Sequence, residues 1–313
     1  MSYSQLTLEQ RYQIYGLKKT GCNQTQIAEI VDVDKSTISR ELRRNKGQKG
    51  YRPKQAQRIA KARRNKVQCR ITDSKWAIVE GLLNLKWSPE EISGWLKKYF
   101  HVQISHEWIY QHVWIDKKQG GKLYKHLRCQ KSYRKRSQTG EKRGKIPNQT
   151  SIEERPAVVE DRERLGDWEG DTIIGKGKQG AIVTLVDRKS RLLRMGLVAR
   201  RTKDAVKEAV INLLKDYPVH TITFDNGKEF AEHEEIAQSL DADIYFAHPY
   251  SSWERGTNEN TNKLIRQYFP KDTDFRELSN SDVQFVESQL NFRPRKCLAF
   301  EQPMVFLKSH CCT

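Results

Sequence analysis

The sequence lacks any continuous run of about 18 apolar residues, and no secretory signal is recognisable in it. A transmembrane helix needs such a run, so a membrane-spanning protein is not expected. We therefore expect a cytoplasmic protein without a membrane partner. Internal repeats of the solenoid type are also missing, which argues against a repeat architecture.

Cysteine and histidine do not occur in the patterns that disulfide frameworks or zinc sites require. The six cysteines show no CxxC spacing, and four of them lie far apart in the chain. His101, His106 and His112 are closer together, but spacings of five and six residues do not put them on one helix face. These patterns favour ordinary reduced thiols and argue against a structural zinc site.

What the sequence has in excess is positive charge, and that excess is confined to its first half. The 313 residues include 57 Lys and Arg against 39 Asp and Glu, a net charge of +18. Residues 1–150 hold 33 of the cationic residues and 12 of the acidic ones, whereas residues 151–313 hold 24 and 27. Because Lys and Arg that neutralise phosphates release condensed counterions, nucleic acid is the expected partner of the first half.

Two short helical patterns joined by the turn DVD predict a helix-turn-helix in residues 1–46. The patterns are QTQIAEIV and KSTISRELRRN, with apolar residues on one face of each. Asp32 takes the turn position that often holds Gly, which is acceptable because Asp enters the left-handed region more readily than most residues. A three-helix bundle with solvated charges is the alternative. The outward face of the second helix favours DNA contacts, at Ser36, Thr37, Arg40, Arg43 and Arg44.

Composition changes divide the rest of the chain into further segments. We expect a basic linker at 47–70, a second helical domain resembling a helix-turn-helix at 71–127, another basic linker at 128–155, and a core domain with a C-terminal helix at 156–313. Residues 47–70 could instead form a helix that lies along phosphates. In the second helical domain, Ser88 and Ser105 each open a helix, and Trp95, Trp108 and Ile109 are expected in its core.

Apolar runs after residue 156 predict a mixed sheet flanked by helices. Strands are expected at 167–174, 180–187, 192–198, 220–224 and 243–247, and helices at 203–217, 229–240 and 254–268. The first three strands are typical of an antiparallel meander, and the later alternation of strands and helices is typical of an α/β domain. The fold class is therefore an all-α N-terminal region followed by an α+β or α/β core.

Three acidic residues of this core are placed where they could converge. Asp225 follows a buried strand and precedes an Asn-Gly turn, and such strand ends are where ligands gather in these sheets. Asp171 shares one strand face with Asp167 and Glu169 by the two-residue period. Glu259 lies on a predicted helix with one polar, mostly charged face, which taken alone could also be a solvated surface. That face carries Arg255, Glu259, Asn262 and Arg266.

The motifs WEGDTI, VDRKSR, TFDNGKEF, HPYSSWERGTNENTNKLIRQYFPK and NFRPRKCLAFEQPMVF resemble, in this order, the catalytic core of IS30-family insertion-sequence transposases. They are more distantly similar to the retroviral integrase core, which has an RNase H-like fold. The resemblance covers roughly residues 150–307, and the helix-turn-helix extends it over most of the chain. The 33 residues between Asp225 and Glu259 agree with the DD(33)E arrangement of that family.

This resemblance implies roles for individual residues. Asp171, Asp225 and Glu259 correspond to the catalytic, metal-binding triad, whereas Asp167, Glu169 and Asp187 become supporting acids. DNA contacts are implied on the helix of Glu259, at Arg255, Asn262, Lys263 and Arg266. The run from Arg293 to Lys296 resembles the family's C-terminal signature, without a clear role. The resemblance also implies that the protein forms at least a dimer on double-stranded DNA. This DNA comprises the terminal inverted repeats and the target, and the protein is accordingly expected to associate with the nucleoid.

The chemistry that such a triad performs can be stated from physical principles. Phosphodiester cleavage develops negative charge on the attacking and leaving oxygens, and two divalent ions about 3.5–4 Å apart stabilise both. Oxygen ligands suit Mg²⁺, for which Mn²⁺ is expected to substitute. Water attack would expose a 3′-OH, and this 3′-OH would then join the target DNA at the same site. No covalent protein–DNA intermediate is needed.

Three other functions compete with a transposase. A transcriptional regulator with an inert α/β domain would tolerate loss of the carboxylates and would have a small-molecule pocket. A nuclease of the RNase H type, acting on RNA–DNA hybrids, fits poorly with two DNA-binding modules ahead of the core. An inactive transposase relic is disfavoured because all three acids are present.

Overall fold

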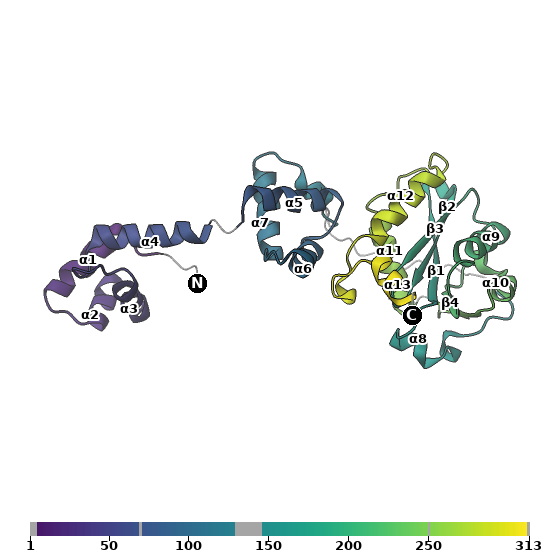
Figure 1. Ribbon diagram of the computed structural model, residues 1–313, viewed down its shortest axis with the longest axis horizontal. Coiled ribbons are helices and arrows are strands. Elements are labelled where there is room, and N and C mark those ends of the chain that lie inside the picture. The colour runs from purple at the N-terminus through teal and green to yellow at the C-terminus, as the bar shows by residue number, and fades with distance from the viewer. Residues whose placement is uncertain (1–4, 69–70, 129–145, 250, 312–313) are drawn as a thin grey trace. The chain divides into compact units, whose positions relative to one another are not determined.

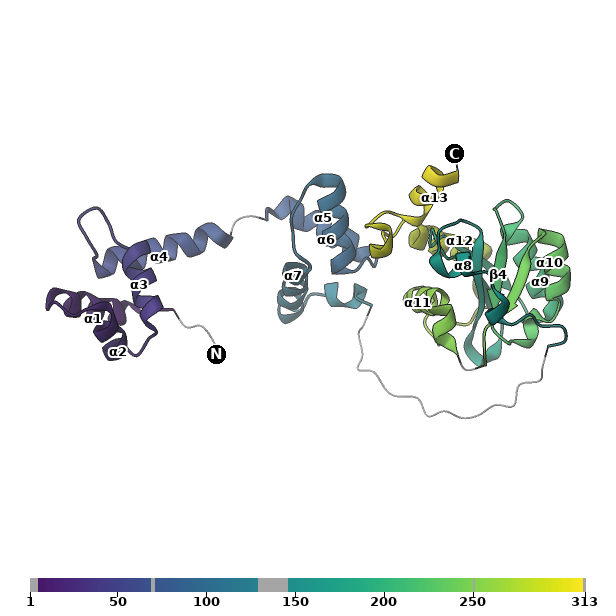
Figure 2. The same cartoon turned by 90° about the horizontal axis from the view of Figure 1, so that it is seen from below.

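The computed structural model describes residues 5–68, 71–128, 146–249 and 251–311 (Figures 1 and 2). These residues form two compact units, one up to Trp76 and one from Ala77 onward. The second linker expected at 128–155 lies largely outside the described residues. Within the described ranges, no helix has the length and apolar character needed to cross a membrane.

The first unit contains the predicted helix-turn-helix. Its helices are α1 (Leu8–Lys19), α2 (Gln24–Val31), α3 (Lys35–Arg44) and α4 (Pro53–Gln68). Asp32 ends α2 in the left-handed region at φ 55°, which confirms the expectation for the DVD turn. Asp34 then caps α3 by accepting a hydrogen bond from the backbone N–H of Ser36.

A buried ion pair that the sequence did not reveal joins α1 to α3. Arg11 Nε lies 2.8 Å from Glu41 Oε1, and both side chains are about 95% buried. Asn45 and the Tyr51 hydroxyl also donate hydrogen bonds to the Glu41 carboxylate, at 2.6 and 3.1 Å. Because every one of these groups is shielded from water, the pair depends on its partners for stability.

The basic segment at 47–70 differs from the linker that its composition indicated. Most of it is helix α4, and Tyr51 and Ala56 are buried in the hydrophobic cluster of the first unit together with Ile14 and Ile38. Because most residues of the segment are polar or cationic, its two buried apolar residues were not evident from the sequence. The structure also shows that α4 packs against α1. The segment therefore belongs to the first unit.

Three helices follow, of which two form the second predicted pair. They are α5 (Asp73–Asn84), α6 (Pro89–Phe100) and α7 (His106–Lys118), followed by the short helix η1 (Leu123–His126). Ser88 and Ser105 cap α6 and α7 as expected. Ile109 is buried, but Trp108 is 50% exposed, so its assignment to the core is wrong. Trp108 is the third residue after the cap Ser105 and lies on the outer side of α7.

The second unit also contains a five-stranded mixed sheet of order β3-β2-β1-β4-β5. Strands β1 (Asp167–Ile174), β2 (Ala181–Asp187) and β3 (Leu193–Val198) form the predicted antiparallel meander. Strand β4 (Thr221–Phe224) runs parallel to β1, and β5 (Asp243–Phe246) runs parallel to β4. The mixed sheet expected from the sequence is thereby confirmed.

Helices cover both faces of the sheet (Figure 1). Helices α9 (Lys203–Leu214) and α10 (His233–Leu240) bury one apolar face, while α11 (Gly256–Ile265) and α12 (Asn280–Asn291) bury the other. The two-residue period of β1 puts Trp168 toward α9 and Ile173 toward α11. Asp171 lies two residues before Ile173, so its side chain is on the same face of the strand and faces α11.

The remaining elements are two helices and several short helical turns. The helices are α8 (Ala157–Asp161) and α13 (Pro303–Cys311). The short helices are η2 (Ile152–Glu154), η3 (Lys176–Lys178), η4 (Lys228–Phe230), η5 (Ser252–Arg255) and η6 (Lys296–Leu298).

Candidate active site

Strand register brings Asp171 and Asp225 to the same level of the sheet. The parallel pairing of β1 with β4 matches Asp167 with Thr221 and Glu169 with Thr223. Two residues further along each strand lie Asp171 and Asp225, which keep the same face because side chains alternate with a period of two. Neighbouring strands lie about 4.8 Å apart, so two carboxylates far apart in sequence become neighbours in space.

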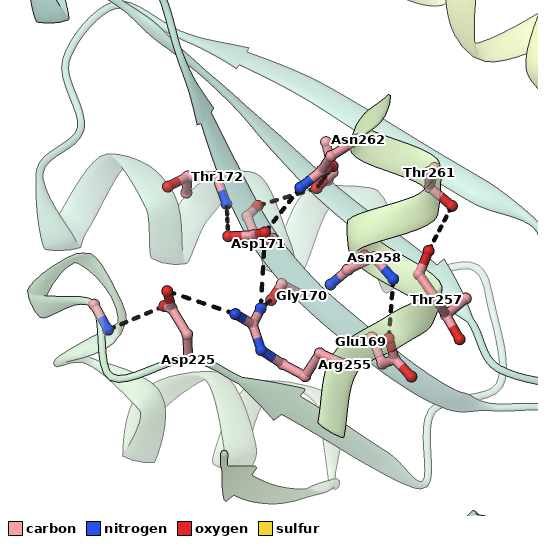
Figure 3. A network of polar contacts seen from close by, with 12 residues as sticks. Glu169, Gly170, Asp171, Thr172, Asp225, Arg255, Thr257, Asn258, Thr261 and Asn262 are labelled. Carbon is pink, nitrogen blue, oxygen red and sulfur yellow. Dashed lines mark hydrogen bonds and ion pairs between the residues drawn. The ribbon is translucent and has the colours of Figure 1, made fainter. Parts of the chain in front are cut away.

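Local hydrogen bonds orient both carboxylates (Figure 3). Asp171 Oδ1 accepts the backbone N–H of Thr172 at 2.8 Å, and Asp171 Oδ2 accepts the side-chain amide of Asn262 on α11, also at 2.8 Å. Asp225 Oδ1 accepts the backbone N–H of Gly227 at 3.0 Å, within the turn that follows β4. The two acids are therefore held by the turn, the strand and α11.

The guanidinium of Arg255 lies between the two acids (Figure 3). Its Nη1 is 3.8 Å from Asp171 Oδ2, and its Nη2 is 3.6 Å from Asp225 Oδ2. Nη1 also donates a hydrogen bond to the Gly170 carbonyl at 3.0 Å, and the side chain is only 11% exposed. Arg255, for which the sequence indicated DNA contact, thus turns toward the sheet and acts as the cation that both carboxylates share.

Burial raises the pKa of Asp171 to about 6. The positive charge of Arg255 opposes this rise in pKa, and the negative charge of Asp225 adds to it. A carboxyl group with such a pKa binds a proton readily near neutrality when no stronger cation is close. Asp171 is therefore the group through which proton concentration affects this site.

Close packing between Gly170 and Phe224 sets the spacing of the two strand ends. A Cβ atom on Gly170 would lie 2.3 Å from a carbon of the Phe224 ring, and Phe224 precedes Asp225 directly. The Phe224 ring also stacks on Phe230 at a centroid distance of 4.1 Å. The aromatic ring is therefore closely packed by two neighbours.

Glu259, the third acid of the predicted triad, does not join the other two in this structure. Its carboxylate pairs with Lys263 at 2.6 Å and is 49% exposed. In the part of the chain that the structure describes, no three acidic, histidine or cysteine side chains are grouped closely enough to hold a metal. Yet Arg255 and Asn262, four residues before Glu259 and three after it, both reach Asp171. By helical spacing, Glu259 lies on the same face of the helix as these two residues, but its side chain turns to Lys263.

The three supporting acids are each committed to structural partners. Glu169 pairs with Arg188 at 2.8 Å and accepts the backbone N–H of Asn258. Asp167 accepts two hydrogen bonds from Arg164, and Asp187 accepts the backbone and hydroxyl donors of Ser190. These contacts hold the strand ends and the β2–β3 turn in place.

The other residues nominated for DNA contact fall into two groups. On α3, the exposed residues are Ser36, Arg40, Arg43 and Arg44, and Thr37 is half-buried. On the α11 side, Lys263 is exposed, whereas Arg266 donates to the Ile174 carbonyl at 2.8 Å and lies over the Phe275 ring. Arg266 therefore fastens the end of α11 to β1.

Sequence reasoning missed Glu229 beside the acidic pair. Its carboxylate is buried, accepts the Thr172 hydroxyl at 2.8 Å and pairs with Arg201 at 3.2 Å. The only signal in the sequence is its position four residues after Asp225, within TFDNGKEF. Glu229 links the end of β1 to the turn that carries Asp225.

Comparisons with known proteins agree with this architecture. Residues 2–45 match a family model described as a helix-turn-helix domain. The chain is 45% identical over 305 residues to the transposase for insertion sequence element IS4351 of Bacteroides fragilis, covering 95% of this chain and 94% of that protein. It is 36% identical over 317 residues to the transposase InsI for insertion sequence element IS30A of Escherichia coli (strain K12), covering 95% and 82%.

The chain belongs to the IS30 family of insertion-sequence transposases. A further relative in Cupriavidus metallidurans, the transposase for IS1086, is 35% identical over 322 residues. Among solved structures, the catalytic core domain of BIV integrase is similar to 47% of this chain at 20% identity and a TM-score of 0.38. As a member of this family, the chain is a transposase that contains both the helix-turn-helix unit and the sheet that carries Asp171 and Asp225.

Proposed function

We propose that this transposase binds the terminal inverted repeats of its insertion sequence and catalyses metal-dependent DNA cleavage and strand transfer through Asp171, Asp225 and Glu259. The observation that carries this proposal is the convergence of Asp171 and Asp225 on one cation, Arg255. Two carboxylates on neighbouring strands that face the same cation support the assignment of a metal site at this place. Their all-oxygen donors suit Mg²⁺, and two ions per site are proposed.

The chain's own residues have distinct roles in this mechanism. A bound divalent ion would stabilise the charge that develops on the attacking and leaving oxygens of the phosphodiester. Asn262 and the Thr172 N–H keep the Asp171 carboxylate oriented, and the Gly227 N–H does the same for Asp225. A water molecule is the first nucleophile and the exposed 3′-OH is the second, so no side chain forms a covalent bond to DNA.

Glu259 completes the site by a change of side-chain rotamer. The Glu259–Lys263 pair is on the surface, and such exposed pairs contribute only about 0.5 kcal/mol. Breaking it is therefore a small cost. Release of Glu259 would at the same time free the Lys263 ammonium for a DNA phosphate.

Recognition of the terminal repeats is assigned to α3. Its outward face carries the exposed side chains of Ser36, Arg40, Arg43 and Arg44 beside Thr37, and α3 is the second helix of the helix-turn-helix. In this motif the second helix enters the major groove. Two ends must be held together for joining, so at least a dimer is proposed on DNA.

A strand-transfer assay on the terminal repeats of the insertion sequence tests this function. Purified full-length protein is incubated with labelled repeat DNA and target DNA, with Mg²⁺, with Mn²⁺ or with EDTA. Nicked ends and joined products are expected only with metal. Asp225→Asn should abolish both products while end binding is retained.

Other outcomes of this assay would contradict the proposal. Joining by the Asp225→Asn protein would remove Asp225 from the active site. Binding without any cleavage in either metal would favour a transcriptional regulator or an inactive relic. Cleavage of an RNA–DNA hybrid in preference to repeat DNA would favour a nuclease of the RNase H type.

Metal affinity should depend on pH through Asp171. Since the pKa of Asp171 is about 6, a proton competes with the metal below that pH, and affinity should rise by up to about tenfold per unit as pH increases toward 6 and level off above 7. The stability of the metal-free protein should depend on pH in the opposite direction. Its free energy of unfolding should fall as pH rises from about 4 to 6, because the folded protein holds a proton on Asp171 that the unfolded chain releases. Titration with Mn²⁺ from pH 5 to 8 measures the first effect, and a flat profile would contradict it.

Arg255→Ala should tighten Mn²⁺ binding by DNA-free protein about tenfold. The guanidinium occupies the space between Asp171 and Asp225, and removing it eliminates a competing cation. Electron paramagnetic resonance of free Mn²⁺ measures this affinity without any catalytic readout. Arg201→Ala is the matched control, because Arg201 pairs with Glu229 instead. Weaker binding by the Arg255 variant would mean that this side chain supports the metal site.

A further inference from the structure

Three arginines line a cavity next to α11 that is separate from the acidic pair. The cavity has a volume of about 220 Å³ and contains side chains from four parts of the core. Its lining residues are Arg162, Arg191, Gly256, Thr257, Asn260, Thr261, Arg295 and Cys297, none of which is acidic. Figure 3 shows Thr257 and Thr261 on the side of α11 that faces away from Asp171. The cavity therefore does not belong to the site already described.

None of the three arginines has a carboxylate within 4 Å among the described residues, although the core contains many ion pairs. Arg295 is 92% buried and donates to the Leu290 carbonyl, and Arg191 Nη1 donates to the Thr257 hydroxyl at 2.7 Å. The Nε of Arg191 is buried and has no hydrogen-bond partner. Nearby acids are occupied elsewhere, since Glu169 pairs with Arg188. Arg295 is a buried cation without an anion, which is costly, and the buried, unpaired Nε of Arg191 adds to that cost, whereas Arg162 is exposed.

The arginines also weaken one another's charged state. Burial lowers the pKa of Arg162, and the charges of Arg191 and Arg188 lower it further. Burial also lowers the pKa of Arg295 to about 10, with a contribution from Arg293. Arg162 and Arg191 both adopt left-handed backbone conformations, at φ 58° and 62°. Left-handed backbone at non-glycine residues is costly and is concentrated at functional sites.

The first turn of α11 adds further donors to the same cavity. The residue before this helix, Arg255, provides no side-chain cap, so the N–H groups of the first turn depend on other partners. Asn258 N–H finds one in Glu169, on the sheet side. Gly256 and Thr257 line the cavity instead. The positive end of the helix dipole favours an anion near this end of the cavity.

We propose that this cavity, which we call the arginine cavity, binds a phosphate group, either a phosphodiester of the bound DNA or a free phosphate. Arg162 and Arg191 would donate to the phosphate oxygens from the rim, and Arg295 from the base. The planar guanidinium matches phosphate geometry through paired hydrogen bonds. If the phosphate belongs to DNA, the site rests on the proposed DNA-processing function and adds a backbone contact to it.

The same proposal gives part of the C-terminal motif a role. Arg293 pairs with Glu91 at 2.8 Å, and Lys296 pairs with Glu90 at 2.6 Å, so these two cations are neutralised by α6. Arg295 lies between them in sequence and points into the arginine cavity without an acid. The motif thus supplies two structural cations and one cation for a ligand.

The test compares Arg162→Gln/Arg191→Gln with the charge-matched control Lys215→Gln/Lys308→Gln, whose lysines are exposed. Both variants keep Arg295, and unfolding temperatures without ligand show that both are folded. The first arm measures binding of terminal-repeat duplex in EDTA over a range of salt concentrations. The second arm measures the unfolding temperature with millimolar inorganic phosphate. Neither arm depends on metal or on cleavage, so failure of the proposed catalysis does not affect the result.

A DNA phosphodiester in the cavity predicts a smaller salt dependence for the arginine variant only. The slope of log K against log salt should fall in magnitude by about 0.9 for each DNA phosphate that the variant no longer neutralises. A free phosphate predicts instead an unchanged slope, with stabilisation by inorganic phosphate in the wild type and control but not in the arginine variant. If the arginine variant matches the control in both arms, the phosphate site is disproved.

Discussion

Glu259→Gln should reduce metal-dependent cleavage of terminal-repeat DNA about a thousandfold, although Glu259 pairs with Lys263 in this structure. A metal ligand contributes several kcal/mol to the stabilisation of transition-state charge, and each 1.36 kcal/mol corresponds to a factor of ten in rate. The amide keeps the size of the side chain but cannot supply the negative charge. Single-turnover cleavage with Mg²⁺, compared with wild-type protein, measures this effect.

Two neighbouring substitutions separate a catalytic role from a structural one. Glu254→Gln, five residues earlier, removes an acid that pairs with His248, and it should leave cleavage within a few fold of wild type. Lys263→Gln should not cause the same loss, because it frees Glu259 from its present partner. If Glu259→Gln cleaves as well as the Glu254 variant does, Glu259 is not the third acid of the site.

Arg11→Met should destabilise the first unit by about 3–5 kcal/mol, because it leaves the Glu41 carboxylate buried without its cation. A small domain has a total stability of about 5–15 kcal/mol, so this change removes a large share of it. Hydrogen exchange of the full-length protein should show lost protection in α1 to α4, while the sheet of the second unit keeps its protection. Binding of the terminal repeats should fall with the folded fraction.

Lys18→Met on the exposed side of α1 is the control for that prediction, since it removes the same charge from a solvated position. It should change stability by less than about 0.5 kcal/mol. The double variant Arg11→Met/Glu41→Met should recover part of the lost stability, because replacing both members of a buried pair with apolar groups removes the uncompensated charge. Equal destabilisation by Arg11→Met and Lys18→Met would mean that the buried pair is not important for folding.

Much of the fold could be predicted because it is encoded by local patterns. Apolar runs separated by turn residues predicted all five strands, and capping residues such as Ser88 and Ser105 predicted where helices begin. The burial of residues that contact distant parts of the chain could not be predicted from local patterns. Tyr51 and Ala56 lie in a strongly basic segment, and their contacts with the first unit's core show that the segment is not a linker.

The site shows the same division between local and distant information. The positions of Asp171 within a strand and of Asp225 at a strand end followed from the pattern, and their roles stay predictions. The direction of a long side chain cannot be read from a sequence: Arg255 turns to the acids, Arg266 binds a strand carbonyl, and Glu259 turns to Lys263. A helical face predicts which residues are neighbours but not which partner each of them selects.

Gly170 has no side chain, and the Phe224 ring occupies the space that a side chain would need. A single added methyl group would press on this ring, against which Phe230 is also packed. Because Asp225 follows Phe224 directly, a displacement of the ring would reach a carboxylate of the proposed metal site. A residue that contributes no reactive atom is therefore a position at which mutation would disturb the proposed chemistry.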